Sequence, residues 1–193
     1  MVTLQQEKLN CIEKLICACD KCELAQHRNK AVPGEGAADA EIMIIGEGPG
    51  EENDKTGRPF VGRGGKILDK YLEEAGLQRD KMFLTNIIKC RMPHNATPNQ
   101  AVISACQDYL TQQIEVIQPK IIITLGLPAA KLMLKNKQLT LASICEDIFD
   151  YETYKLLCTY HPSSIRYNKE AGQQIAHTLE KAKKLIEGGY GMT

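Results

Sequence analysis

The sequence predicts an α/β protein, a three-layer α/β/α sandwich with a central, mainly parallel four-stranded sheet. Four short apolar runs have the length of buried strands, and glycine or polar residues end them. Segments with helical spacing of apolar residues alternate with these runs. Strands that alternate with helices are typical of a parallel sheet covered on both faces.

The first half of the chain has two predicted helices and one predicted strand. In order, we expect a helix over 4–18, a polar loop over 19–30, a strand over 41–46, a Gly/Pro-rich loop over 46–65 and a helix over 67–75. Gly46 ends the strand, and Gly76 is expected to cap the second helix at its carboxyl end.

The second half continues the alternation. In order, we expect a strand over 82–88, a helix that runs towards Gln118, a strand over 120–125, a short helix over 129–134, a strand over 156–160 and a helix over 171–186. Thr97 is the predicted N-cap of the helix that ends near Gln118, because Pro98 suits the first helical position. Ligands of such folds bind beyond the carboxyl ends of the strands, where the loops after Ile45, Ile88 and Tyr160 begin.

Composition narrows the class of protein. The 193 residues suit a single domain over 1–193, with a disordered tail after about residue 187. A formal net charge of zero argues against a protein that coats nucleic acid without specificity, although it allows one DNA-binding face. The chain starts with polar residues and has no apolar run long enough to span a bilayer. We therefore expect a cytoplasmic protein without a membrane partner.

Four of the eight cysteines have the arrangement of metal ligands. Cys19 and Cys22 form a C-x-x-C pair, Cys90 directly follows a predicted strand, and Cys106 lies on the next helix. Without a signal peptide, metal or cluster ligation is favoured over disulfides. Spacing alone leaves zinc and a [4Fe–4S] cluster equally open.

The other four cysteines are expected to have no ligand role. Cys145 and Cys158 fall in apolar surroundings and are predicted to be buried, inert thiols. Cys11 and Cys17 lie in the first predicted helix. Cys17 ranks behind Cys19 as a ligand, because the Cys19–Cys22 spacing suits a chelating loop.

The glycine-rich segment after the first strand does not suit phosphate binding. It lacks both the P-loop pattern and the glycine spacing of a dinucleotide fingerprint. Its acidic side chains would repel a pyrophosphate; they are Glu47, Glu51, Glu52 and Asp54.

Three blocks of the chain together resemble the signature of family 4 uracil-DNA glycosylases. The blocks are Gly46-Glu-Gly-Pro-Gly50 through Gly57-Arg-Pro-Phe-Val-Gly62, Thr85-Asn-Ile-Ile-Lys-Cys90, and Tyr160-His-Pro-Ser-Ser-Ile-Arg166. The resemblance covers about residues 19–184. It implies an enzyme that flips uracil out of single- or double-stranded DNA and hydrolyses the N-glycosidic bond, which leaves an abasic site for base excision repair. It also implies a [4Fe–4S] cluster on Cys19, Cys22, Cys90 and Cys106. We expect a monomer.

The chemistry of that reaction assigns roles to the matched residues. Cleavage builds positive charge on the sugar and negative charge on the departing base, so the site needs a carboxylate and a hydrogen-bond donor. By the resemblance, Glu47 orients or activates water. His161 is the candidate donor to the uracil oxygen, and Pro162 restrains it to an extended backbone.

The remaining matched residues are expected to hold the base and the DNA. Phe60 would stack on the flipped uracil, and Asn86 would read its edge, because one amide offers both a donor and an acceptor. Gly48 would contact the substrate through its backbone amide. The predicted DNA contacts are Ser163, Ser164, Ile165 and Arg166. Further predicted phosphate contacts are Lys89, Arg91 and Lys169.

One position departs from the family, and two alternative functions stay open. The family often has a second carboxylate where this chain has Asn53. The change is expected to affect either the catalytic rate or the exclusion of thymine.

One alternative function is that of a cluster-bearing relative with a different base range or with covalent DNA trapping. Glu47 argues against a relative with a different base range. The absence of a basic insertion in 160–166 argues against a relative that traps DNA covalently. The other alternative is a non-catalytic DNA-binding or redox module.

Overall fold

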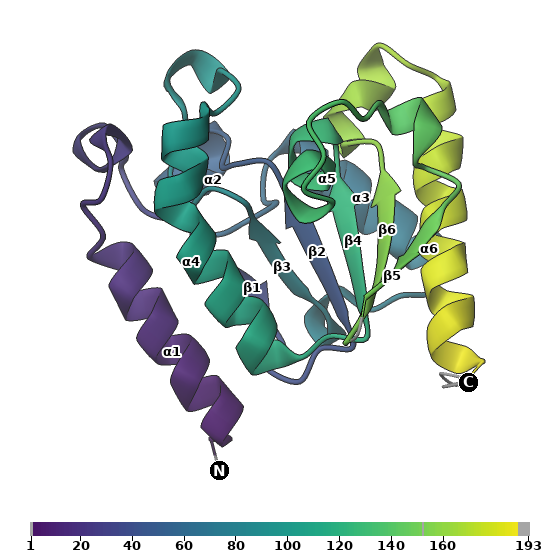
Figure 1. The fold of residues 1–193 in the computed structure, drawn as a ribbon, viewed down its shortest axis with the longest axis horizontal. Helices are drawn as coiled ribbons and strands as arrows, with labels where there is room; N and C mark the ends of the chain where they lie inside the picture. Colours follow the sequence, from purple (N-terminus) through teal and green to yellow (C-terminus); the bar gives the residue numbers. More distant parts are fainter. Residues whose placement is uncertain (1, 152, 189–193) are drawn as a thin grey trace.

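A computed structural model describes residues 2–151 and 153–188. Its central sheet has the strand order β1-β3-β2-β4-β6-β5 within the described residues (Figure 1). The inner strands β3, β2, β4 and β6 run parallel, whereas β1 and β5 pair antiparallel at the two edges. The bounds are β1 Glu35–Gly36, β2 Ile42–Gly46, β3 Phe83–Asn86, β4 Ile121–Leu125, β5 Ile148–Asp150 and β6 Lys155–Thr159.

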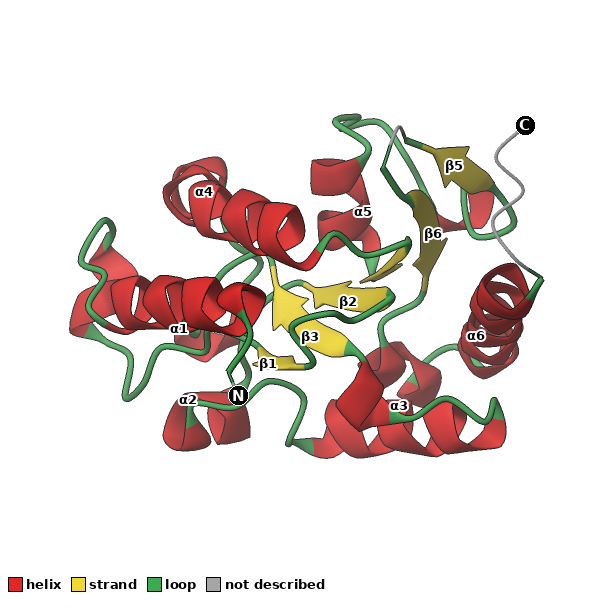
Figure 2. Ribbon diagram, turned by 90° about the horizontal axis from the view of Figure 1, so that it is seen from below, coloured by secondary structure: helices red, strands yellow, loops and turns green. Residues whose placement is uncertain are grey.

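Helices cover both faces of the sheet. Figure 2 shows α1, α4 and α5 on one side of the strands and α3 and α6 on the other. The bounds are α1 Leu4–Cys17, α2 Glu51–Thr56, α3 Arg63–Glu74, α4 Gln100–Ile117, α5 Leu127–Met133 and α6 Glu170–Glu187. None of the described helices combines the length and apolarity needed to cross a membrane.

The apolar runs form strands because both of their faces are buried. Side chains alternate between the faces of a strand, so Met43 and Ile45 join the core under α1 and α4, while Ile42 and Ile44 join the core under α3 and α6. Each face of the sheet thus packs against its own apolar layer. This explains why apolar and polar residues do not alternate along these strands. The predicted three-layer α/β fold with four parallel strands is confirmed, and two edge strands are added to it.

The differences from the predicted elements are local. The edge strands β1 and β5 were not predicted, because two and three residues are too few to show a period. Helix α2 forms inside the segment predicted to be a loop. Strand β3 ends at Asn86 rather than at residue 88. Part of the predicted disordered tail, residues 189–193, lies outside the described residues.

The start of α4 also differs from the prediction. Asn99, and not Thr97, is the N-cap, because its side-chain oxygen accepts the Val102 N–H at 3.0 Å. The segment Pro93–Asn95 before it forms a short 3-10 helix, η3. The four parallel strands end at the same edge of the sheet, so the loops after β2, β3 and β6 meet there as predicted.

Candidate active site

A cleft of about 550 Å³ opens at the carboxyl edge of the sheet. Residues from all three sequence blocks line it, although they are far apart in the chain. The predicted site residues in its lining are Glu47, Gly48, Phe60, Asn86, His161 and Ser163. The topology brings them together because β2, β3 and β6 are parallel members of one sheet.

Glu47 is the first residue beyond β2. Its backbone carbonyl accepts the Ile88 N–H at 3.2 Å, which fixes the residue beside the end of β3. Among the described residues, no cation forms an ion pair with its carboxylate. Burial therefore acts unopposed and raises the pKa of Glu47. A half-buried carboxylate without a charge partner is suited to accept a proton or to orient water.

His161 is held in one tautomer by the turn that follows it. The 3-10 helix η5 (Pro162–Arg166) begins directly after it, and the Ser163 backbone N–H donates to His161 Nδ1 at 3.2 Å. Since a backbone N–H can only donate, Nδ1 accepts, and the ring proton lies on Nε2. Burial lowers the pKa of His161, which favours the neutral ring. His161 is thus a neutral hydrogen-bond donor through Nε2–H.

Phe60 and Asn86 lie against each other at the end of β2. A Cβ atom added to Gly46 would come within 2.5 Å of Asn86 Oδ1 and 2.8 Å of Phe60 Cζ. Only glycine leaves room for both side chains there. Phe60 is 7 % and Asn86 3 % exposed, so an aromatic face and an amide share one enclosed end of the cleft.

The backbone of Phe60 is strained. Its φ of 52° is in the left-handed region, which is unfavourable for a bulky residue. Arg79 holds the loop in place, because its guanidinium donates to Pro59 O at 2.9 Å and pairs with Glu35 at 2.9 Å and Asp69 at 2.7 Å. Such strain at a cleft is typical of functional positions.

The other predicted DNA contacts lie beside the cleft. Ser164 uses its hydroxyl within the turn, donating to His161 O at 2.7 Å. Ile165 packs partly against the core under α3 and α6. Arg166 is exposed, with its guanidinium 5.6 Å from the centre of the Tyr167 ring. The prediction that Lys89 contacts phosphate is wrong, because its side chain is 1 % exposed.

Arg63 is a cleft residue that was not predicted. It begins α3, and the glycines around it also line the cleft. The first turn of a helix has unpaired N–H groups, which with an arginine favour an anion. The signal in the sequence was a basic residue among closely spaced glycines, Gly62-Arg-Gly-Gly65.

The four predicted ligand cysteines line one small cavity between α1, α4 and the loop after β3; they are Cys19, Cys22, Cys90 and Cys106. The Arg28 guanidinium lies 3.2 Å from Cys90 Sγ. No set of three or more His, Cys, Asp or Glu side chains in the described residues is close enough to form a metal-ion site.

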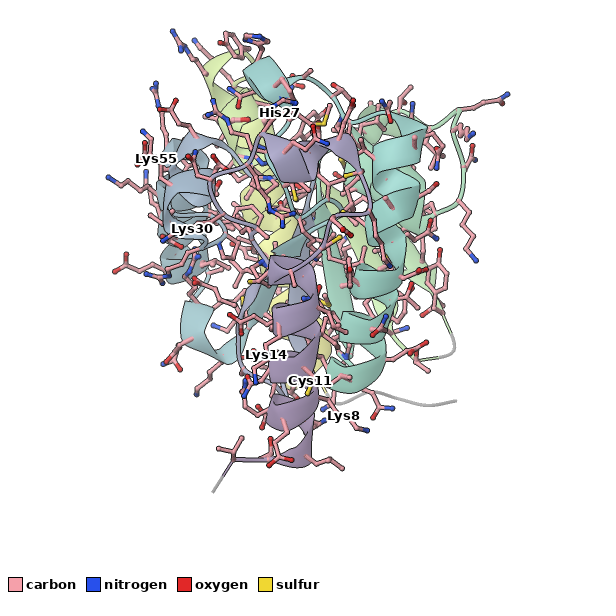
Figure 3. The ribbon with its side chains drawn as sticks, turned by 90° about the vertical axis from the view of Figure 1, so that its left-hand side faces the viewer. Lys8, Cys11, Lys14, His27, Lys30 and Lys55 are labelled. Atoms are coloured by element: carbon pink, nitrogen blue, oxygen red, sulfur yellow. The ribbon has the colours of Figure 1, made fainter. Side chains whose placement is uncertain are left out.

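The remaining cysteines lie outside this cavity. Figure 3 shows Cys11 on the outer side of α1, between Lys8 and Lys14. Cys17 is exposed as well. The prediction that Cys145 and Cys158 are buried is confirmed, since they are 7 % and 0 % exposed.

Residues 33–185 match the family model of the uracil DNA glycosylase superfamily. The chain belongs to this superfamily. A type-4 uracil-DNA glycosylase of Sulfurisphaera tokodaii is 40 % identical over 187 residues, which cover 93 % of this chain and 85 % of that protein. A type-4 uracil-DNA glycosylase of Thermotoga maritima is 37 % identical, with 95 % and 97 % covered. A type-5 uracil-DNA glycosylase of Pyrobaculum aerophilum is 26 % identical, with 84 % and 77 % covered.

In this superfamily member, the side-chain amide of Asn53 forms two hydrogen bonds within the first sequence block. Asn53 Oδ1 accepts the Gly50 N–H at 2.9 Å, and Nδ2 donates to Arg58 O at 2.8 Å. A carboxylate at this position could accept the first bond but could not donate the second. Asn53 therefore closes the loop around α2, at the rim of the cleft.

Proposed function

We propose that the chain is a uracil-DNA glycosylase, which flips uracil out of DNA and hydrolyses its N-glycosidic bond to leave an abasic site. The convergence of Glu47, Phe60, Asn86 and His161 on one cleft carries the proposal. The names of the type-4 relatives support it. A base inside a duplex is out of reach of side chains, so the uracil must leave the stack to enter the cleft.

The enclosed end of the cleft suits a uracil ring. Phe60 offers an aromatic face for stacking, and Asn86 offers a donor and an acceptor for the base edge. With its NH₂ group towards O4 and its carbonyl towards N3–H, the amide matches uracil. Cytosine presents the opposite pattern and would leave both groups mismatched.

Bond cleavage requires stabilisation of charge at two places. As the C1′–N1 bond breaks, negative charge moves to the base, where the His161 Nε2–H would donate to a uracil oxygen. Positive charge builds on the sugar, close to the Glu47 carboxylate, which would also orient the attacking water and accept its proton. The products are free uracil and an abasic sugar.

The DNA backbone would lie along the rim of the cleft. Ser163 lines the cleft, and Arg63 stands at the first turn of α3. Arg166 and the backbone amide of Gly48 add further predicted contacts. Contacts of this kind position the strand without reading its sequence. Cytoplasmic location, the monomeric state and one domain over 1–193 stay predictions.

We propose a [4Fe–4S] cluster as the cofactor, held by Cys19, Cys22, Cys90 and Cys106. Four thiols on one cavity are the donor set of such clusters, and the Arg28 cation beside Cys90 would offset thiolate charge. Hydrolysis moves no electrons, so the cluster would supply structural cross-linking. It would join the loop after α1 to the loop after β3 and to α4.

The proposed function is tested with an oligonucleotide that contains a single uracil. Incubation and alkali treatment should break the strand at the uracil and nowhere else. A protein that binds the oligonucleotide without breaks would be the non-catalytic module. A denaturation-resistant protein–DNA adduct would indicate the covalent kind of relative instead.

Replacing Cys19 by serine is expected to remove most iron and sulfide from anaerobically purified protein, which should be brown in the wild type. Loss of one of four ligands opens the cluster to solvent. Iron and sulfide analysis measures the effect, and Cys145→Ser is the control that should keep full iron content. A colourless wild type that is fully active with one zinc would contradict the cluster.

Asn86→Asp is expected to cut uracil excision strongly, because the aspartate lacks the NH₂ donor for O4. A buried mismatch of this kind costs about 1–3 kcal/mol per unsatisfied group. A protonated acid could present the opposite pattern and allow slight cytosine excision. Single-turnover cleavage of matched oligonucleotides with uracil or cytosine measures both effects. Unchanged uracil excision would show that another group reads the base.

A further inference from the structure

Lys89 is a buried lysine whose Nζ has three hydrogen-bond acceptors. Its side chain is 1 % exposed, and its Nζ donates to Thr85 Oγ1 at 2.6 Å, Gln113 Oε1 at 2.8 Å and Asn86 O at 2.9 Å. An ammonium has three N–H bonds, and these acceptors use all of them. Lysine is almost never fully buried unless it is paired, so the arrangement requires an explanation.

The acceptors of Lys89 belong to two parts of the fold, the end of β3 and helix α4. Thr85 and Asn86 end β3, and Gln113 lies on α4. The network continues to the segment before β1, because Pro33 O accepts from Gln113 Nε2 at 2.8 Å and from Thr85 Oγ1 at 2.9 Å. The end of β3 is thus tied to α4 through buried polar groups.

The side chain of Asn86 depends on this support. Among the described residues, no hydrogen bond holds its side-chain amide. Its backbone is fixed on one side by the pairing with Gly46 in β2, and its carbonyl is fixed by Lys89. A shift of the strand end would therefore move the amide directly, away from the edge of a bound base.

We propose that Lys89 is a positioning residue for base recognition, holding the end of β3 so that the Asn86 amide meets uracil in the matching orientation. This role rests on the proposed glycosylase function. Lys89 does not touch the base. Its effect passes through Asn86, and this distinguishes it from a residue that only stabilises the fold.

A double-mutant cycle tests the proposal. Lys89→Met keeps an unbranched apolar side chain that is one atom shorter and removes the three donors. We expect single-turnover uracil excision to fall about 10- to 100-fold, as for the loss of buried hydrogen bonds, with iron content retained. Lys89→Met combined with Asn86→Ala should be about as slow as Asn86→Ala alone, because interacting residues are not additive. Losses that multiply in the double variant, or a wild-type rate for Lys89→Met, would overturn the role.

Two further variants guard against a purely structural explanation. Leu110→Ala creates a cavity on α4, the helix of Gln113, without touching the network; it should lower the melting temperature and leave the rate unchanged below it. If Lys89→Met does not fold, Thr85→Val replaces it in the cycle, with an expected loss of about 5- to 10-fold and the same non-additivity. A wild type that releases no uracil would overturn both proposals, whereas multiplying losses in an active enzyme overturn only the role of Lys89.

Discussion

His161→Ala is expected to slow single-turnover uracil release by about 10²–10³-fold, the usual loss for one donor to a developing negative charge. The bond between Ser163 N and His161 Nδ1 places the ring proton on Nε2, so the wild-type enzyme has a donor without recruiting a proton. Alanine leaves the departing base without this partner. Rates are measured with enzyme in excess over a uracil-containing oligonucleotide.

Binding separates this loss from a failure to hold DNA. The affinity of His161→Ala for the same oligonucleotide should stay close to that of the wild type, since the donor acts mainly as charge develops. His177→Ala is the matched control, because His177 lies on α6 and pairs with Glu146 at 3.5 Å. Wild-type rates for His161→Ala would remove His161 from the mechanism.

Glu47→Gln is expected to lower the single-turnover rate by about 10²–10⁴-fold, the range for a general base or a charge-stabilising carboxylate. Glutamine keeps the size of the side chain but carries no charge and accepts no proton from water. DNA binding should be largely preserved. Glu74→Gln is the control, since Glu74 is an exposed carboxylate at the end of α3 that lies outside the cleft lining and pairs with Lys70 at 3.6 Å.

The pH dependence of the rate gives a second measure of the role of Glu47. In the proposed role the ionised form is the active one, so the rate should rise as pH passes upward through the pKa of this group. Burial raises the pKa of Glu47, which places this acid limb above the ordinary glutamate value of about 4.3. Burial lowers the pKa of His161, so its neutral ring persists as pH falls through about 6.5, its ordinary value. In Glu47→Gln the limb due to Glu47 should disappear, and an unchanged profile would assign the limb to another group.

The main strands and most of the cleft were predictable because their signals are local. Burial on both faces produces an uninterrupted apolar run, so β2 and β4 stand out in the sequence. Parallel strands end at one edge, which predicts that Glu47, Asn86 and His161 lie together. The edge strands and α2 were missed because two to six residues leave too short a pattern.

By itself, the sequence determined the fold class, the cysteines that line one cavity and six of the residues that line the cleft. Only the tertiary structure decided which polar side chains form hydrogen bonds inside the protein. Lys89 looks like a surface cation in sequence, yet its partner Gln113 lies 24 residues further along the chain. The tautomer of His161 and the use of the Asn53 amide likewise follow from the fold of their loops. A polar side chain has many possible hydrogen-bond partners, and the folded structure selects among them by distance and burial. Neither quantity can be read from the spacing of residues along the chain.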